Sequence, residues 1–264
     1  MSSSQPTIPN GRPLDGKSAI VTGAATGIGK AIASRLARDG AAIVVNHLPA
    51  QQREGDAVVA SIGDAGGRAV AEPADISNRQ QFADLFDHAR DVFGKVDILI
   101  NNAAIAPLTP VAEATDEQID AVLSVNIKGT LYGCQLAVEQ LSDNGRIINI
   151  SSSTTGLALP GYGIYDMSKG AIEQLTRILA KEVGPRGITV NAISPGATET
   201  DTYRLGKDPD FVAGLERMSA FNRLGRVEDI ADVVAFIASD DARWITGQNI
   251  RVNGGTVPSS CTAQ

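Results

Sequence analysis

Short apolar segments alternate with longer segments of helical periodicity along almost the whole chain. The apolar segments, which we expect to be strands, are 18–22, 42–46, 68–75, 96–103, 145–151, 188–194 and 249–255. The helical patterns lie between them, at 27–39, 51–66, 78–93, 116–141, 163–183 and about 228–239. This alternation predicts an α/β fold with a doubly wound parallel sheet and helices on both faces. Right-handed crossovers then bring the functional loops to the carboxyl ends of the strands.

No linker, repeat or low-complexity segment divides the chain, so we expect a single domain over 14–264. The first thirteen residues are rich in Ser, Pro, Asn and Gly, which favours a flexible N-terminal arm. They lack the charged and apolar regions of a secretory signal. The one long irregular stretch, 197–225, is interpreted as a lid. A solvated loop without a role is the alternative.

Composition narrows the classes of function. The net charge of −7 and the pI of about 4.9, without a long basic run, argue against a nucleic-acid partner. Cys134 and Cys261 are far apart, and His47 and His88 have no histidine or cysteine at ligand spacing, so neither a disulfide nor a metal site is predicted. No apolar run is long enough to span a membrane. These features predict a cytoplasmic protein whose partner is a small molecule.

A glycine-rich turn, T-G-A-A-T-G-I-G at 22–29, joins the first predicted strand to the first helix. Gly23 permits a tight turn, Gly27 lets backbone N–H groups approach a pyrophosphate, and Gly29 lets the helix lie close to the sheet. The positive end of the helix dipole then faces the anion. The turn therefore predicts a dinucleotide site, to which Thr26 and Ile28 also belong.

The end of the second strand bears on which dinucleotide binds. An acidic residue about 20 residues beyond the glycines would hold a ribose 2′-hydroxyl and select NAD. Here the sequence is VVNHLPAQQR, with no acid before Glu54. A 2′-phosphate would not be repelled, and Thr26, Asn46 or His47 could hydrogen-bond to it. We therefore expect NADP(H) in preference to NAD(H), with Asp75 and Ile76 beside the adenine.

These motifs together resemble those of the short-chain dehydrogenase/reductase family, over about residues 14 to 256. The matching segments are T-G-A-A-T-G-I-G at 22–29, N-N-A-A at 101–104, Asn126, a serine in ISSS, Tyr165-Asp-Met-Ser-Lys169 and Pro195-Gly196. The resemblance implies a single Rossmann-type domain, a nicotinamide cofactor and hydride transfer between a carbonyl and an alcohol. It also implies a homotetramer or dimer that shares the helices 116–141 and 163–183. Ala104 departs from the family, which most often has glycine there, and we expect it to be tolerated at negative φ.

Two tyrosines compete for the role of proton donor. Tyr165 and Lys169 are four residues apart on a predicted helix and share a face. Tyr162 follows Pro160-Gly161 and precedes Gly163, so we expect it to lie before the helix and to touch the substrate. Tyr165 also matches the family's Y-x-x-x-K motif. We predict that Lys169 lowers the pKa of the Tyr165 phenol and binds the nicotinamide ribose.

Three serines, Ser151, Ser152 and Ser153, stand where the fifth strand ends. If the strand runs that far, alternation points the first and third to one face and the second to the other. The family's spacing of thirteen residues from serine to tyrosine selects Ser152, which would polarise the substrate carbonyl. Ser151 and Ser153 are then structural.

Other assignments rest on the resemblance. Asn126 would complete a catalytic tetrad by holding a water that links Lys169 to solvent. The remaining cofactor contacts expected at strand ends are Asn102, Ala103, Ala104, Pro195, Gly196, Thr198 and Thr200. Residues 201–222 would cover the substrate, and Thr154, Tyr162 and Tyr203 are predicted to line its pocket.

The leading hypothesis is an NADP(H)-dependent carbonyl reductase or alcohol dehydrogenase. One alternative is an NAD-dependent sugar or polyol dehydrogenase of the same family. Others are an epimerase or dehydratase on this fold and a nucleotide-sensing protein that has lost catalysis. Fold does not choose among substrates. Few charges are identifiable in the predicted pocket, which disfavours a highly charged one.

Overall fold

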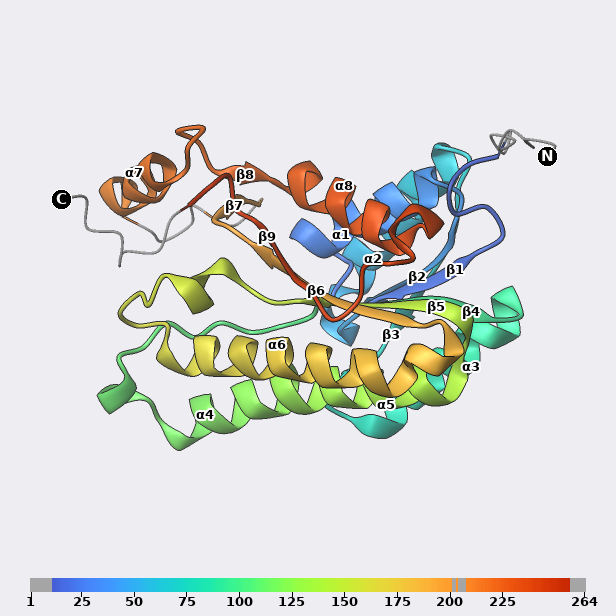
Figure 1. Cartoon of the computed structure of the whole chain (residues 1–264), viewed down its shortest axis with the longest axis horizontal. Coiled ribbons are helices and arrows are strands. Elements are labelled where there is room, and N and C mark those ends of the chain that lie inside the picture. Colours follow the sequence, from blue (N-terminus) through green and yellow to red (C-terminus); the bar gives the residue numbers. More distant parts are fainter. Residues whose placement is uncertain (1–10, 201–202, 204–207, 257–264) are drawn as a thin grey trace, which may run out of the picture.

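Seven parallel strands form the central sheet, in the order β3-β2-β1-β4-β5-β6-β9 (Figure 1). The computed structural model describes residues 11–200, 203 and 208–256. The strands are β1 (Ser18–Val21), β2 (Ala42–His47), β3 (Arg68–Pro73), β4 (Val96–Asn101), β5 (Leu141–Ile150), β6 (Thr189–Pro195) and β9 (Asn249–Val252). The predicted parallel sheet is confirmed. The strand order reverses between β1 and β4, and at such a point an α/β sheet opens a crevice beyond the strand ends.

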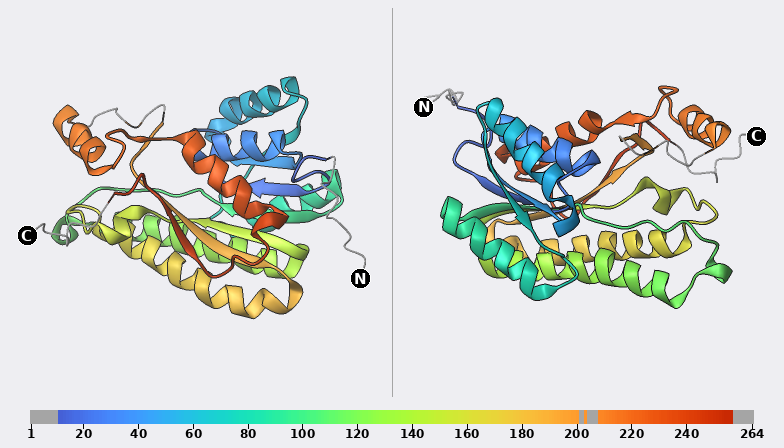
Figure 2. Two further views of the ribbon diagram at one scale, coloured as in Figure 1. Left: turned by 45° about the horizontal axis from the view of Figure 1, so that its top comes forward. Right: turned by 180° about the vertical axis from the view of Figure 1, so that it is seen from behind.

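Helices cover both faces of the sheet, as predicted (Figures 1 and 2). One layer comprises α1 (Gly27–Arg38), α2 (Gln52–Asp64) and α8 (Val227–Ala238), and the other α3 (Arg79–Phe93), α5 (Thr130–Gln140) and α6 (Gly163–Val183). Each layer has its own apolar core. In β1, Ala19 and Val21 join the first core and Ile20 the second. Ala19, Ile20 and Val21 are all apolar because both faces of this strand are buried.

The helical pattern predicted over 116–141 contains a π-helical segment. It comprises α4 (Asp116–Val122), the π-helical η3 (Leu123–Gly129) and α5. Thr115 caps its start with its side chain, in a capping box with Gln118. The π-helical segment carries Asn126 and packs against α6. Such irregular turns are frequent at functional sites.

The stretch 197–225, interpreted as a loose lid, contains regular structure. The elements are β7 (Thr198–Glu199), α7 (Pro209–Met218) and β8 (Gly225–Arg226), with β7 paired to β8. Asp208 caps α7 with its side chain and Pro209 occupies the first helical position. Val212 and Leu215 of α7 form part of a small third core. Residues 201–202 and 204–207 lie outside the described residues, so the predicted lid is only partly described.

The first described residues tie the chain to the sheet's helical layer. Leu14 is 1% exposed and its N–H donates to the carbonyl of Asp39 after α1. The predicted arm, 1–13, falls mostly outside the described residues and stays a prediction. Within the described ranges, we find no helix with the length and apolarity needed to cross a membrane.

Several apolar side chains stay exposed on the two helices that the resemblance assigns to subunit contacts. Leu131 is 37% exposed on α5, and Met167 and Ile178 are 53% and 48% exposed on α6. Apolar exposure of this kind is typical of surfaces that associate. The homotetramer or dimer stays a prediction, which sedimentation equilibrium would check.

Candidate active site

Two adjoining cavities lie at the carboxyl edge of the sheet, each of about 440 Å³. The first, the nucleotide groove, is lined by the predicted residues Gly23, Thr26, Gly27, Ile28, Gly29, Asn46, His47, Asp75, Ile76, Asn102, Ala103, Ala104 and Thr200. The second, the reaction cavity, is lined by Ser152, Thr154, Tyr162, Tyr165, Lys169, Pro195, Gly196, Thr198 and Tyr203. Ile28, Asn102, Ala104 and Thr200 line both, so the two cavities are neighbours.

The glycine-rich turn sets the floor of the nucleotide groove. Gly27 has a φ of +55° and opens α1, so the helix N-terminus faces the groove. A Cβ on Gly29 would lie 2.2 Å from the carbonyl oxygen of Gly23, which only glycine allows. Thr26 precedes the helix without a side-chain capping bond, and its side chain is exposed. These features fit an anion-binding turn.

Gly29→Ala should destabilise the fold, because the added methyl must displace backbone rather than a flexible side chain. We expect a loss of about 1–3 kcal/mol in the free energy of unfolding, measured by urea titration. Gly63→Ala in α2 is the matched control, since nothing lies within 4 Å of its Cβ position. That variant should be stabilised by up to about 1 kcal/mol. Equal stability of the two variants would contradict the close contact.

Polar side chains fasten the ends of β1 and β4 together beside this turn. The Thr22 hydroxyl donates to the Ile100 carbonyl at 3.2 Å and accepts the N–H groups of Asn102 and Ala103. The Asn102 amide donates to the Thr22 carbonyl at 2.9 Å. Ala104, which follows, does not have a positive φ, so its methyl is accommodated as expected. These contacts hold the boundary between the two cavities.

The end of β2 differs in detail from the prediction. The Asn46 amide donates to the Ala74 carbonyl at 3.0 Å, and its oxygen accepts the Gly23 N–H at 3.3 Å. Asn46 therefore ties β2 to its neighbours and is not available to a 2′-phosphate. The His47 ring is 1% exposed and packs against Gly55, with Nδ1 2.9 Å from the Leu48 carbonyl. No carboxylate stands at this strand end.

Tyr165 and Lys169 lie on the first two turns of α6, as predicted. The Lys169 Nζ is 5.5 Å from the centre of the Tyr165 ring and donates to the Ile150 carbonyl at 2.7 Å. Tyr162 precedes the helix at the N-cap position. Its ring packs edge-on against Tyr165, with centroids 6.3 Å apart. The helix thus places one tyrosine with the lysine, while the other lines the same cavity from a position before the helix.

Burial dominates the ionisation of both groups. It raises the pKa of the Tyr165 phenol to about 12, while a side-chain hydrogen bond with Ser152 acts in the opposite direction. Burial lowers the pKa of Lys169 to about 8. The predicted lowering of the Tyr165 pKa by Lys169 is therefore wrong, because desolvation of the phenolate outweighs any stabilisation. Tyr165 keeps its proton at neutral pH, which suits a proton donor.

Of the three serines, Ser152 is the one whose side chain acts on Tyr165, where it lowers the pKa of the phenol against the effect of burial. The strand ends before the serine run, and Ser152 caps the short helix that follows. The Ser151 hydroxyl donates to the Glu173 carboxylate at 2.9 Å. The Ser153 hydroxyl donates to a β6 backbone carbonyl at 2.9 Å. All three serines line the reaction cavity, and the hydroxyls of the outer two are bonded to α6 and β6. The assignment of Ser152 to the substrate carbonyl stays a prediction.

Asn126 is fully buried and lines neither cavity. Its carboxamide accepts the Ile105 N–H and donates to the Ile105 carbonyl, both at 2.9 Å. It also donates to the Ser168 hydroxyl at 3.0 Å. The side chain thereby holds the segment after β4 against α6. Its role in holding a water stays a prediction.

Comparison with known proteins places this geometry in a family. A family model described as enoyl-(acyl carrier protein) reductase matches residues 23–257. An uncharacterised oxidoreductase of Methylorubrum extorquens is 44% identical over 244 residues, which cover 92% of this chain and 98% of the relative. The chain belongs to the short-chain dehydrogenase/reductase family.

Solved members of the short-chain dehydrogenase/reductase family share the whole fold. The angucycline C-6 ketoreductase LanV, with bound NADP, has a TM-score of 0.88 and 39% identity, over 93% of this chain and 97% of its own. A short-chain dehydrogenase of Burkholderia cenocepacia in complex with NADP has a TM-score of 0.87 and 36% identity, over 92% and 99%.

Lys169→Met should stabilise the fold near neutral pH. Folding lowers the pKa of this buried lysine from 10.5 to about 8, so the protonated form carries a cost that is complete below about pH 8 and vanishes above 10.5. The shift corresponds to at most about 3 kcal/mol. We expect the variant's advantage in urea unfolding at about pH 7 to shrink as the pH rises. Lys181→Met, on the exposed side of α6, should show no such trend. If Lys169→Met is less stable than wild type at about pH 7, burial of the protonated lysine does not carry the expected free-energy cost.

Sequence reasoning missed most of the apolar wall of the reaction cavity. The added lining residues are Leu108, Leu157, Leu159, Leu215 and Met218. Leu215 and Met218 come from α7, whose start was signalled by Asp208-Pro209. Among the described lining residues, Lys169 is the one charged side chain. The cavity therefore suits a neutral, largely apolar molecule.

Leu48 and Gln51 are additional residues of the nucleotide groove.

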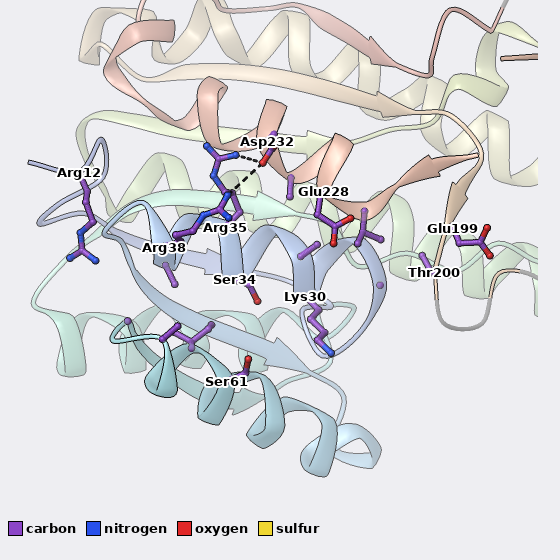
Figure 3. A pocket seen from close by; sticks show the side chains of 18 residues that line it. Arg12, Lys30, Ser34, Arg35, Arg38, Ser61, Glu199, Thr200, Glu228 and Asp232 are labelled. Atoms are coloured by element: carbon purple, nitrogen blue, oxygen red, sulfur yellow. Dashed lines mark hydrogen bonds and ion pairs between the residues drawn. The ribbon is translucent and has the colours of Figure 1, made fainter. Parts of the chain in front are cut away.

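A larger cavity, of about 850 Å³, lies elsewhere, along α1 between α2 and α8 (Figure 3). Two of its arginines pair with acidic side chains. Arg35 bonds to Asp39 and Asp232, and Arg38 lies 3.8 Å from Asp232. It shares Gly27 and Thr200 with the nucleotide groove but contains neither Tyr165 nor Lys169. Size alone therefore does not mark the reacting site.

Proposed function

We propose that this protein is an NADP(H)-dependent carbonyl reductase that also runs in reverse as an alcohol dehydrogenase. As a short-chain dehydrogenase/reductase, it is an oxidoreductase. The observation that carries the finer proposal is the meeting of Ser152, Tyr165 and Lys169 in a cavity that adjoins the nucleotide groove. A nucleotide sensor would need no such set. The proposal includes one catalytic domain over 14–264 and a cytoplasmic location.

The nucleotide groove fits a phosphorylated dinucleotide. The α1 N-terminus and the turn at Gly27 would hold the pyrophosphate, and Asp75 and Ile76 would flank the adenine. Asn46 and His47 are buried at the end of β2, and this strand end has no carboxylate that would repel a 2′-phosphate. Two similar solved structures, one of a ketoreductase and one of a short-chain dehydrogenase, contain NADP. These observations favour NADP(H) over NAD(H) and over the sugar or polyol dehydrogenase alternative.

The residues of the reaction cavity would donate the proton, hold the carbonyl oxygen and stabilise the phenolate. Bound NADPH supplies the hydride that reduces the carbonyl carbon. Tyr165 donates its phenolic proton to the carbonyl oxygen, and Ser152 holds that oxygen by a hydrogen bond. The Lys169 ammonium, fixed by the Ile150 carbonyl, stabilises the phenolate that remains and binds the ribose. Asn126 completes the set by linking Lys169 to solvent through a water.

The apolar wall selects the substrate class. Leu108, Leu157, Leu159 and Met218 favour a neutral ketone or aldehyde with an apolar body. We expect NADPH oxidation with neutral aromatic and aliphatic carbonyls, and weaker activity with charged analogues of the same size. The kcat/KM with NADPH should exceed that with NADH by at least about tenfold, which is about 1.4 kcal/mol. A preference for NADH, or cofactor binding without turnover across the panel, would overturn the proposal.

A further inference from the structure

Ser152 stands at one end of a chain of hydrogen-bonded side chains that runs to the carboxyl group of Asp166. Ser152 lines the reaction cavity together with Tyr165. The Ser152 Oγ lies 2.7 Å from the Thr154 Oγ1, and either oxygen could be the donor. The Thr154 hydroxyl donates to the Asp166 Oδ1 at 2.5 Å. We call Ser152, Thr154 and Asp166 the hydroxyl chain; Asp166 follows Tyr165 in sequence and is half-buried.

The number of protons on these groups decides which group donates each hydrogen bond in the hydroxyl chain. Each hydroxyl has one proton, and an ionised carboxylate only accepts. When Asp166 is ionised, its carboxylate accepts a hydrogen bond from the Thr154 hydroxyl. Thr154 has no second proton, so it can only accept a hydrogen bond from Ser152. Ser152 then has no proton to donate elsewhere. When Asp166 is protonated it can donate to Thr154, Thr154 donates to Ser152, and the Ser152 proton becomes free.

The remaining contact of Ser152 does not change with this direction. The backbone N–H of Thr154 donates to the Ser152 Oγ at 3.2 Å, in agreement with the N-cap position of Ser152. It occupies a lone pair of the oxygen in both protonation states. The direction of the Ser152 proton is therefore decided by Thr154, and through it by Asp166.

We propose that Asp166 is a positioning residue that decides, through Thr154, whether Ser152 donates or accepts a hydrogen bond in the reaction cavity. The inference rests on the proposed function, since it concerns the carbonyl oxygen held by Ser152 and Tyr165. A carbonyl oxygen can only accept. Reduction therefore needs the direction in which Ser152 donates, which is the one that a protonated Asp166 permits.

The surroundings of Asp166 bring its titration closer to neutral pH. Burial raises the pKa of this carboxyl, the Thr154 hydrogen bond lowers it, and the nearby charge of Glu173 raises it, with a net rise above the ordinary 3.8. The neighbouring titratable and charged groups are Tyr162, which precedes α6, and Tyr165, Lys169 and Glu173 of α6. Farther along, the Arg251 guanidinium of β9 lies against Gly156. Burial and Asp166 raise the pKa of Tyr162, so that phenol stays neutral.

The test is the pH profile of reductive kcat/KM in wild type and three variants. Thr154→Val keeps the shape and removes the hydroxyl, Thr154→Ser keeps the hydroxyl, and Asp166→Asn removes the titration. Wild type and Thr154→Ser should lose kcat/KM as the pH rises through the pKa of Asp166. Thr154→Val and Asp166→Asn should lack this decline. The kcat/KM of Thr154→Val divided by that of wild type should therefore rise about tenfold as the pH passes through the pKa of Asp166. A factor of about ten corresponds to the loss of one hydrogen bond.

A second readout needs no turnover. In a carbon-13 NMR titration of the carboxyl groups, the signal missing in Asp166→Asn identifies Asp166. Thr154→Val should raise the pKa of Asp166, because the carboxylate loses a donor, and Thr154→Ser should leave it unchanged. Glu173→Gln, by contrast, should lower the pKa of Asp166 and keep the decline in kcat/KM.

The outcomes separate the two proposals. If all variants share the wild-type decline, or if Thr154→Ser loses it with Thr154→Val, the role of Asp166 is overturned. Such a result leaves the carbonyl reductase proposal intact, provided that Tyr165→Phe is inactive. Near-normal turnover in Tyr165→Phe would instead remove the proposed function itself.

Discussion

Tyr165→Phe is expected to lose reductive turnover by a factor of about 10³ while still binding NADPH. The variant keeps the ring that packs against Tyr162 and lies near the Lys169 ammonium. It lacks only the hydroxyl that would give a proton to the substrate. Single-turnover NADPH oxidation measures the loss, and a fluorescence titration measures the binding.

Tyr162→Phe is the matched control for this variant. Tyr162 lines the same cavity and loses the same hydroxyl, but it precedes α6 and has no lysine four residues on. Its kcat should fall by less than about tenfold, a change chiefly in substrate contact. A larger loss in Tyr162→Phe than in Tyr165→Phe would reassign the proton donor.

Ser152→Ala should lower kcat/KM by a factor of about 10², because one preorganised donor to the carbonyl oxygen is lost. Ser151→Ala and Ser153→Ala should lower it far less. Their hydroxyls bond to Glu173 and to β6, so their loss should cost about 1 kcal/mol of folding stability instead. Steady-state kinetics together with urea unfolding of all three variants would show the contrast. If Ser151→Ala or Ser153→Ala loses more activity than Ser152→Ala, the assignment of Ser152 to the substrate carbonyl is wrong.

The sequence predicted what depends on periodicity and on strand ends. Buried parallel strands are continuous apolar runs, so their order along the chain was readable, and with it the edge where Gly27, Asn102 and Lys169 come together. The choice between the two tyrosines used the i, i+4 spacing of Tyr165 and Lys169, the expected start of the helix after Tyr162, and the family's Y-x-x-x-K motif. The choice of Ser152 came from family spacing, and the structure places Ser152 in the same cavity as Tyr165.

Features that depend on tertiary contacts were not predictable. The Asn126 carboxamide, in the π-helical segment, pairs with the backbone of Ile105, a partner 21 residues away. The Asn46 amide bonds to backbone carbonyls that only the folded sheet brings near. The raised pKa of Tyr165 reflects burial, which sequence spacing does not encode. The link from Ser152 to Asp166 likewise needed the positions of three side chains.

Deuterium transfer tests the central claim most directly. An α,β-unsaturated ketone would be incubated with NADPH that carries deuterium at the transferable C4 position, and the product examined by NMR and mass spectrometry. A carbonyl reductase of the proposed kind forms the allylic alcohol, with one deuterium on the carbinol carbon for each NADPH oxidised. A saturated ketone with deuterium on the β-carbon, the result expected of an enoyl reductase, would contradict the proposal, as would an unlabelled product.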